Sequence, residues 1–266
     1  MALIGTLTSG VSALRTFSKG LEVIGSNIAN VNTTGYKSSS TSFKDTFSNT
    51  LRAASGAAGD SAVQIGTGVQ IGGITTNFSQ GSLSSTGKGT DLGISGNGYF
   101  AVQNAAAVNY ATRDGSFHFD TGGSLVNNEG LNVLDTAGAK ITVANYDTVS
   151  SISIGTDGTV NVFYADGTTD SSQAVGLLKV KDESKLMKQG GNLYDFAATG
   201  TVIGDLAGAT TNGLGNIQAG TLELSNVDLT DQFAELITTQ RSFQAGSRLI
   251  TVSDSVLEDI VNLKRS

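Results

Sequence analysis

Residues 1–34 read MALIGTLTSGVSALRTFSKGLEVIGSNIANVNTT, and this stretch decides the fold because its large apolar side chains recur every three or four residues, with one break at Gly10. Such spacing places them on one face of an α-helix, and that face has to be buried against a partner. We therefore predict a helix over residues 1–34 that ends near Gly35, a residue suited to a left-handed helix stop. The predicted apolar seam consists of Leu3, Leu7, Leu14, Phe17, Leu21, Ile24, Ile28 and Val31.

The carboxyl-terminal residues carry a second amphipathic pattern, in which apolar residues recur every seven positions. A helix is predicted from Asp228, whose carboxylate can cap the first turn, to about Leu263. An apolar seven-residue repeat forms a seam that is buried against a partner helix. We therefore predict that residues 1–34 and 226–266 pair as a coiled-coil-like unit. The residues assigned to this second assembly seam are Leu229, Phe233, Leu236, Phe243, Ile250, Leu257 and Ile260.

The predicted amino-terminal helix contains Gly5, Gly10, Gly20 and Gly25, of which only Gly10 breaks the apolar seam. Each glycine costs a helix about 1 kcal/mol relative to alanine, which favours a segment that is helical only when it is packed. A second interpretation is that the glycines let neighbouring helices approach closely. The two interpretations are compatible, and the sequence leaves both open.

The residues between the two helices divide into an arm and a β-domain. Residues 35–62 are polar and low in complexity, which predicts a linker or extended arm. Residues 63–225 show short alternating runs separated by turn signals, and residues 152–164 have the pattern of a β-hairpin around Gly155-Thr156-Asp157-Gly158. The predicted fold class is α+β, with long terminal helices joined by the arm to a mainly antiparallel β-domain.

Composition argues against several functional classes. The net charge of −7 disfavours a nucleic-acid partner, and no apolar run is long enough to cross a membrane. Cysteine is absent from the sequence. The single histidine is His118, and the chain contains no nucleophile motif such as G-x-S-x-G with which it could form a catalytic site. We therefore predict a protein that is not an enzyme, with no catalytic, cofactor-binding or metal-binding residues.

The segment SNIANVNTTGYK at residues 26–37 resembles the amino-terminal signature of the bacterial flagellar rod and hook family. Residues 74–100 (ITTNFSQGSLSSTGKGTDLGISGNGYF) and 220–265 (GTLELSNVDLTDQFAELITTQRSFQAGSRLITVSDSVLEDIVNLKR) are similar to two further regions of that family. The residues assigned to the family motif are Asn27, Ala29, Asn30, Asn32, Thr33, Gly35, Tyr36 and Lys37.

This resemblance implies a structural role. Within the family the likeness is nearest to the hook protein, so we expect a subunit that polymerises helically through its terminal helices into the hollow, flexible hook outside the cell. The alternative is the distal rod protein of the basal body, in the periplasm, which the short length of this chain fits. The resemblance implies as partners further copies of the chain, the rod and hook-filament junction proteins, the hook cap and the type III export apparatus, and it implies no cofactor.

Overall fold

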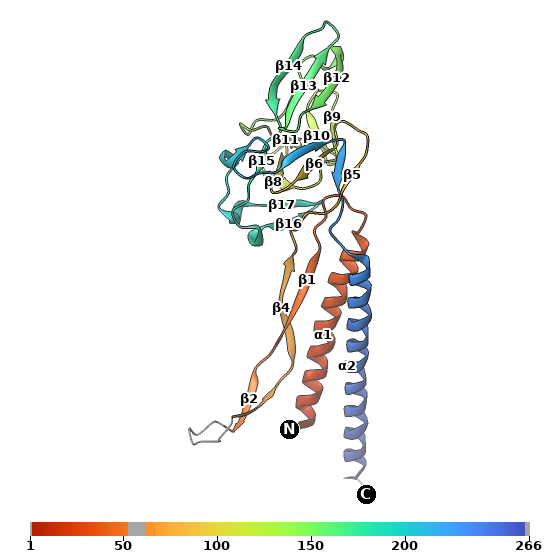
Figure 1. Ribbon diagram of the computed structural model, residues 1–266. Coiled ribbons are helices and arrows are strands. Elements are labelled where there is room, and N and C mark those ends of the chain that lie inside the picture. The colour runs from red at the N-terminus through yellow and green to blue at the C-terminus, as the bar shows by residue number, and fades with distance from the viewer. Residues whose placement is uncertain (1, 53–61, 264–266) are drawn as a thin grey trace. The chain divides into compact units, whose positions relative to one another are not determined.

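A computed structural model describes residues 2–52 and 62–263 of the chain (Figure 1). The chain forms two compact units. The helix-and-ribbon unit takes residues 1–29, 39–77 and 228–266, and the β-unit takes residues 30–38 and 78–227. The units do not follow the boundaries expected from the sequence, because residues 39–77 group with the helices while residues 30–38 group with the β-unit.

The two terminal helices are α1 (Ala2–Ala29) and α2 (Leu229–Leu263). α2 matches the prediction, and the Asp228 carboxylate accepts a hydrogen bond from Thr230 N at 2.8 Å as the expected cap. The predicted end of the first helix is wrong, since α1 stops at Ala29 and Val31 lies outside it. A turn follows, in which Thr33 N donates to Asn30 O at 3.1 Å, so these backbone groups leave the helical ladder.

The helices pack side by side in opposite directions (Figure 1), and glycines of α1 lie at close approaches to α2 and to Phe43 of residues 39–45. A Cβ atom added at Gly10 would lie 3.0 Å from Ile250 Cγ1, and one added at Gly20 would lie 3.3 Å from the ring of Phe43. A Cβ at Gly5 or Gly25 would meet no atom within 4 Å. The glycines therefore divide into packing positions and open positions, and close approach explains Gly10 and Gly20 but not Gly5 and Gly25.

The segment expected as an extended arm contributes to antiparallel ribbons in the helix-and-ribbon unit. β1 (Ser39–Asp45) pairs with β4 (Val69–Thr76), and β2 (Ser48–Arg52) pairs with β3 (Val63–Gly66). The low-complexity stretch at residues 53–59 lies outside the described residues.

Hydroxyl groups on α1 attach the ribbon to the helix. Ser9 Oγ donates to Thr67 O at 3.1 Å, and Thr16 Oγ1 donates to Val69 O at 3.1 Å. Between them, Ser12 Oγ accepts a hydrogen bond from Val69 N at 3.3 Å. The polar face of α1 is thus used inside the subunit.

Every described strand pairing in the β-unit is antiparallel, in agreement with the predicted class. The largest sheet has the order β16-β17-β8-β7-β11-β10-β9, with β15 paired to β7 and β18, and the other pairings are β12-β13-β14, β6-β19 and β5-β20. The strand bounds are β5 (Leu83–Ser85), β6 (Leu92–Ser95), β7 (Tyr99–Gln103), β8 (Asn109–Thr112), β9 (Phe117–Phe119), β10 (Leu125–Asn127), β11 (Asn132–Val133), β12 (Val149–Ile154), β13 (Thr159–Tyr164), β14 (Thr169–Ala174), β15 (Leu177–Leu178), β16 (Met187–Gly190), β17 (Leu193–Asp195), β18 (Leu206–Ala207), β19 (Asn216–Ala219) and β20 (Thr221–Glu223).

Strand β7 lies between two hydrophobic clusters. Phe100 and Val102 face one cluster while Tyr99 and Ala101 face the other, as the two-residue period of a strand requires. All four side chains are buried, so both faces of this strand are covered.

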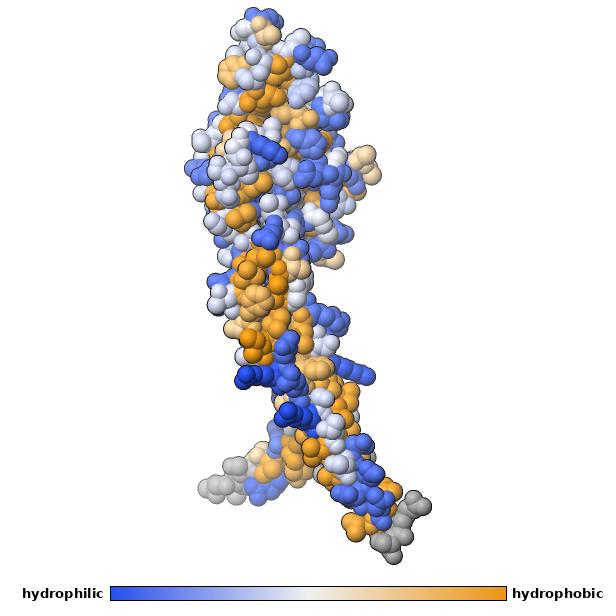
Figure 2. Space-filling model, turned by 90° about the vertical axis from the view of Figure 1, so that its right-hand side faces the viewer, coloured by the Kyte–Doolittle hydropathy of each residue, from blue (hydrophilic) through white to orange (hydrophobic). Residues whose placement is uncertain are grey.

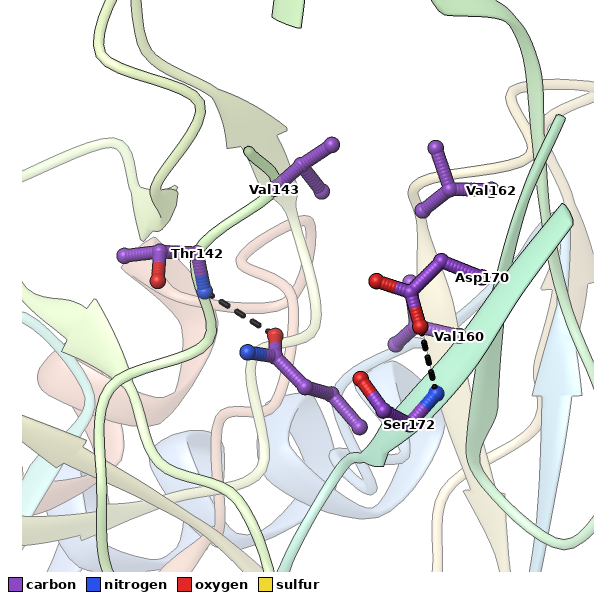
Figure 3. Close-up of a pocket in the computed structure, with 7 residues that line it drawn as sticks. Thr142, Val143, Val160, Val162, Asp170 and Ser172 are labelled. Carbon is purple, nitrogen blue, oxygen red and sulfur yellow. Dashed lines mark hydrogen bonds between the residues drawn. The ribbon is translucent and has the colours of Figure 1, made fainter. Parts of the chain in front are cut away.

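The predicted hairpin is confirmed by β12 and β13, which pair through Ile154 and Val160 around the turn at Gly155–Gly158. Figure 3 shows residues that line a cavity beside the β12-β13-β14 sheet. The cavity has a volume of about 10 Å³, roughly the space of one water molecule. Thr142 N closes it by donating to Gln173 Oε1 at 3.0 Å. The cavity is too small for an organic ligand.

A buried cluster of charges joins distant parts of the β-unit. Glu223 Oε1 lies 2.6 Å from Lys37 Nζ, and Glu223 Oε2 lies 3.1 Å from Arg113 NH1. The three side chains are 0%, 1% and 3% exposed, respectively. Gly81 N also donates to Glu223 Oε1 at 2.8 Å. Because an isolated charge is costly to bury, Glu223 is the group that makes burial of both cations tolerable.

Other groups complete the surroundings of the two cations. Lys37 Nζ donates to Ser79 O at 2.8 Å, and the Arg113 guanidinium lies 5.0 Å from the centre of the Tyr99 ring. Burial lowers the pKa of the Lys37 ammonium from its ordinary value, and the hydrogen bond to Glu223 opposes that shift. The pair therefore depends on direct contact between its charges rather than on solvation.

We predict that Glu223→Gln lowers the free energy of unfolding of the β-unit by about 3–5 kcal/mol, because it leaves two buried cations without their anion. Urea unfolding followed by tyrosine fluorescence measures this, since the chain has no tryptophan and Tyr99 and Tyr194 are buried. Glu129→Gln is the matched control because Glu129 is exposed. Equal midpoints for the two variants would contradict the role given to Glu223.

We predict that Gly25→Ala stabilises α1 by up to about 1 kcal/mol, because alanine favours the helix and its Cβ has open space. Gly10→Ala should lack this gain, since its Cβ would press on Ile250. Hydrogen exchange of the α1 amides checks the difference: exchange should slow up to about fivefold in Gly25→Ala only. Equal slowing in both variants would mean that Gly10 is not a packing position.

Candidate assembly surface

The amino-terminal part of the signature segment lies in the last turn of α1, where Asn27 is buried. Its side-chain Nδ2 donates to Ser39 O at 2.7 Å and to Gln232 Oε1 at 2.8 Å. Its Oδ1 accepts from Ser39 N at 3.0 Å. This one amide therefore ties the end of α1 to the start of β1 and to the first turns of α2, a set of contacts that an aliphatic side chain cannot make.

The rest of the signature belongs to the β-unit. Gly35 has a φ of +66°, and a Cβ there would lie 2.6 Å from Asp114 N, so both its conformation and its close packing require glycine. Gly35 N also donates to Glu223 O at 2.8 Å. Tyr36 and Lys37 are buried beside it. The remaining motif residues are half-buried at Asn30 and Thr33 and exposed at Ala29 and Asn32.

The structure places the predicted seam of α1 mainly at half-buried positions. Ile24 is fully buried and Val31 lies beyond the helix. The Leu3 side chain lies outside the described residues. The half-buried members are Leu7, Leu14, Phe17, Leu21 and Ile28.

The predicted seam of α2 divides into covered and exposed residues. The members that recur every seven positions from Leu236 to Leu257 are half-buried, and Ile250 contacts α1 at Gly10. Leu229, Phe233 and Ile260 are exposed. The described subunit therefore covers one row of this helix and leaves other apolar residues on its surface.

Further apolar residues are exposed on the helix-and-ribbon unit, and hydrophobic areas are visible on its surface in Figure 2. Phe47 is 90% exposed. Scattered exposed apolar residues are normal, but several on one small unit indicate an interaction surface. The exposed apolar residues outside the predicted assembly seams are, on α2, Ile237, Leu249, Val252, Val256, Val261 and Leu263 and, in residues 43–74, Phe43, Phe47, Leu51, Val63, Ile65 and Ile74.

The structure gives two further findings about possible sites. Neither α1 nor α2 combines the length and the apolar character needed to cross a membrane. Within residues 2–52 and 62–263, no three His, Asp or Glu side chains are grouped to hold a metal ion. His118 lies exposed on β9, paired with Val126.

Three family models match the chain. "Flagella basal body rod protein" matches residues 7–37, "Flagellar hook protein FlgE/F/G D1 domain" matches residues 93–162, and "Flagellar basal body rod FlgEFG protein C-terminal" matches residues 218–263. The first match contains the signature segment, and the last contains Glu223 and α2.

Curated relatives extend the similarity to the whole chain. The flagellar basal-body rod protein FlgG of Bacillus subtilis is 40% identical over 99% of this chain and 100% of its own length. FlgG of Borreliella burgdorferi is 30% identical over 100% of this chain and 99% of its own length. The flagellar hook protein FlgE of Helicobacter mustelae is 42% identical, but over 48% of this chain and 30% of its own length. The chain belongs to the family of bacterial flagellar basal-body rod and hook proteins.

Proposed function

We propose that this chain is the distal rod subunit of the flagellar basal body, and that it polymerises helically through its terminal helices. The proposal of polymerisation is supported by the large apolar side chains that are exposed on the helix-and-ribbon unit. Burying one such side chain stabilises an assembly by about 1.5–3 kcal/mol before entropy is subtracted. Coiled-coil-like packing of α1 with α2 and with neighbouring helices is part of this proposal.

The rod is favoured over the hook by the extent of the similarity. The rod relative from Bacillus subtilis matches this chain from end to end, while the hook relative matches about half of it. The hook assignment expected from the sequence is therefore replaced by its alternative. A rod subunit in the cell envelope would contact further copies of itself and the neighbouring rod and hook proteins, and it would reach them through the export apparatus.

We predict that Phe233→Asp combined with Ile237→Asp blocks assembly and leaves the subunit folded. Both side chains are exposed on α2, so the charges meet water in the free subunit but would be buried without partners in the polymer. In a strain that lacks the native chain, the double variant should be soluble and the cells non-motile. Sedimentation and a swimming assay measure these outcomes.

The control is Ala234→Asp combined with Thr238→Asp, which adds the same charges with the same spacing at exposed positions of the same turns. The control should support swimming. Normal swimming with Phe233→Asp and Ile237→Asp would overturn the proposed use of this surface.

We predict that a label on this chain is found on the rod, within the cell envelope, when purified basal bodies are viewed by electron microscopy. The matched control is the same label on a hook subunit, which should appear outside the envelope. Label from this chain along the hook would restore the hook assignment, and absence of the chain from basal bodies would reject both.

A further inference from the structure

The chain contains two Asn-Gly pairs, Asn97-Gly98 and Asn212-Gly213, and both lie in the β-unit. An asparagine that precedes glycine is chemically reactive, because glycine has no side chain to hinder the attack of its own backbone nitrogen on the asparagine amide carbon. That attack closes a five-membered succinimide ring. In a folded protein, the rate depends on the freedom of the local backbone and on the charge around the peptide group that joins the two residues.

The Asn212-Gly213 pair is exposed in the loop between β18 and β19. Asn212 has a φ of +53° and Gly213 has a φ of +76°, so both backbones are in the left-handed region. In the part of the chain that the structure describes, neither Gly213 N nor the Asn212 side chain makes a hydrogen bond with another protein group. No hydrogen bond at either reacting group therefore has to break before the two groups meet.

A cation lies at the oxygen of the same peptide group. Lys179 Nζ donates a hydrogen bond to Asn212 O at 2.7 Å, and a Cβ atom added at Gly213 would lie 3.5 Å from this nitrogen. The attacking form of Gly213 N has lost its proton, and resonance spreads the negative charge onto Asn212 O. The Lys179 ammonium thus lies where the charge develops, and it stabilises that charge.

The surroundings leave the Lys179 charge available to this peptide and admit water. Asp205, the acidic residue that lines the same cavity, forms its ion pair with Lys181, at 3.3 Å. The cavity has a volume of about 580 Å³, and both Lys179 and Asn212 line it. Water, which the second half of the reaction consumes, therefore has access to the loop.

The Asn97-Gly98 pair, in contrast, is held by packing. Gly98 is buried with a φ of +129°, and a Cβ atom added to it would lie 2.9 Å from Leu214 Cδ2. Asn97 O accepts a hydrogen bond from Gly215 N at 2.8 Å, which is a neutral donor. Ring closure requires rotation of the backbone at the asparagine, and here that rotation would displace a close-packed glycine. The two pairs share a motif and differ in freedom and in charge.

We propose that Asn212 is a site of spontaneous deamidation promoted by Lys179. Gly213 N loses its proton to water and bonds to Asn212 Cγ, the Cγ–Nδ2 bond breaks, and ammonia leaves after its nitrogen takes a proton from water. A water molecule then opens the succinimide at either carbonyl, which gives aspartate or isoaspartate at position 212. Either product adds one negative charge beside Lys179, with which it can form an ion pair. This modification does not depend on the proposed assembly role.

Timed incubation of the full chain at neutral pH, followed by tandem mass spectrometry of its peptides, measures deamidation at each asparagine. Asn212 should deamidate faster than Asn97 in the folded chain. In urea the two should react at similar rates, because the fold no longer distinguishes them. Equal rates in the folded chain, or a faster reaction at Asn97, would overturn the proposal.

Variants of Lys179 test the part assigned to its charge. Lys179→Met should slow deamidation of Asn212 about two- to fivefold in the folded chain, as expected for the loss of one exposed charge interaction. Lys179→Arg keeps the charge and should keep most of the native rate. Lys181→Met is the matched control, because Lys181 is exposed in the same cavity but contacts Gly200 O and Asp205.

The control should react at the native rate, and all three variants should react like the native chain in urea. A rate in folded Lys179→Met that equals or exceeds the native rate would show that Lys179 does not promote the reaction. Slowing of Lys179→Met in urea as well would also contradict the proposal, because the contact between Lys179 and Asn212 exists only in the folded chain.

Discussion

The β-unit depends on the carboxylate of Glu223. This carboxylate forms ion pairs with Lys37 of the signature segment and with Arg113, which follows β8, and it accepts a hydrogen bond from Gly81 N. The three charged side chains are buried. Two buried cations share this one buried anion, so loss of the Glu223 carboxylate would leave both positive charges buried without a counter-charge. The backbone of Glu223 also binds Gly35, so the same residue holds the signature in place through its main chain and its side chain.

The helix-and-ribbon unit is organised differently, with few large side chains buried inside it. Among the side chains of α1 and α2 that the structure describes, Ile24 is buried and the other buried ones are polar: Thr16, Asn27, Thr239 and Ser253. Glycines, hydroxyl groups and the Asn27 amide make several of the contacts inside this unit, and many large apolar side chains stay at the surface. Several exposed apolar side chains on one small unit are typical of an interaction surface.

Short sequence patterns correctly predicted those elements that are specified by residues close together in the chain. The apolar period of residues 229–263 and the cap at Asp228 specified α2, and the turn at Gly155–Gly158 specified the β12–β13 hairpin. The signature segment identified the family, which the comparisons confirm. The end of α1 was predicted wrongly, near Gly35, because the residues after Ala29 form contacts with Glu223, Asp114 and Asn192, which lie far along the chain.

The sequence by itself determined that both termini are amphipathic helices and that a mainly antiparallel β-unit separates them, since periodicity and turn residues act over a few positions. Only the tertiary structure decided which apolar residues are covered: Leu236 and Ile250 are half-buried, while Phe233 and Val252 are exposed. A repeat shows that a helix face is apolar, but the neighbour that covers it is chosen by packing across the whole chain. For the same reason, only the structure showed that Lys37, Arg113 and Glu223 meet in one buried cluster.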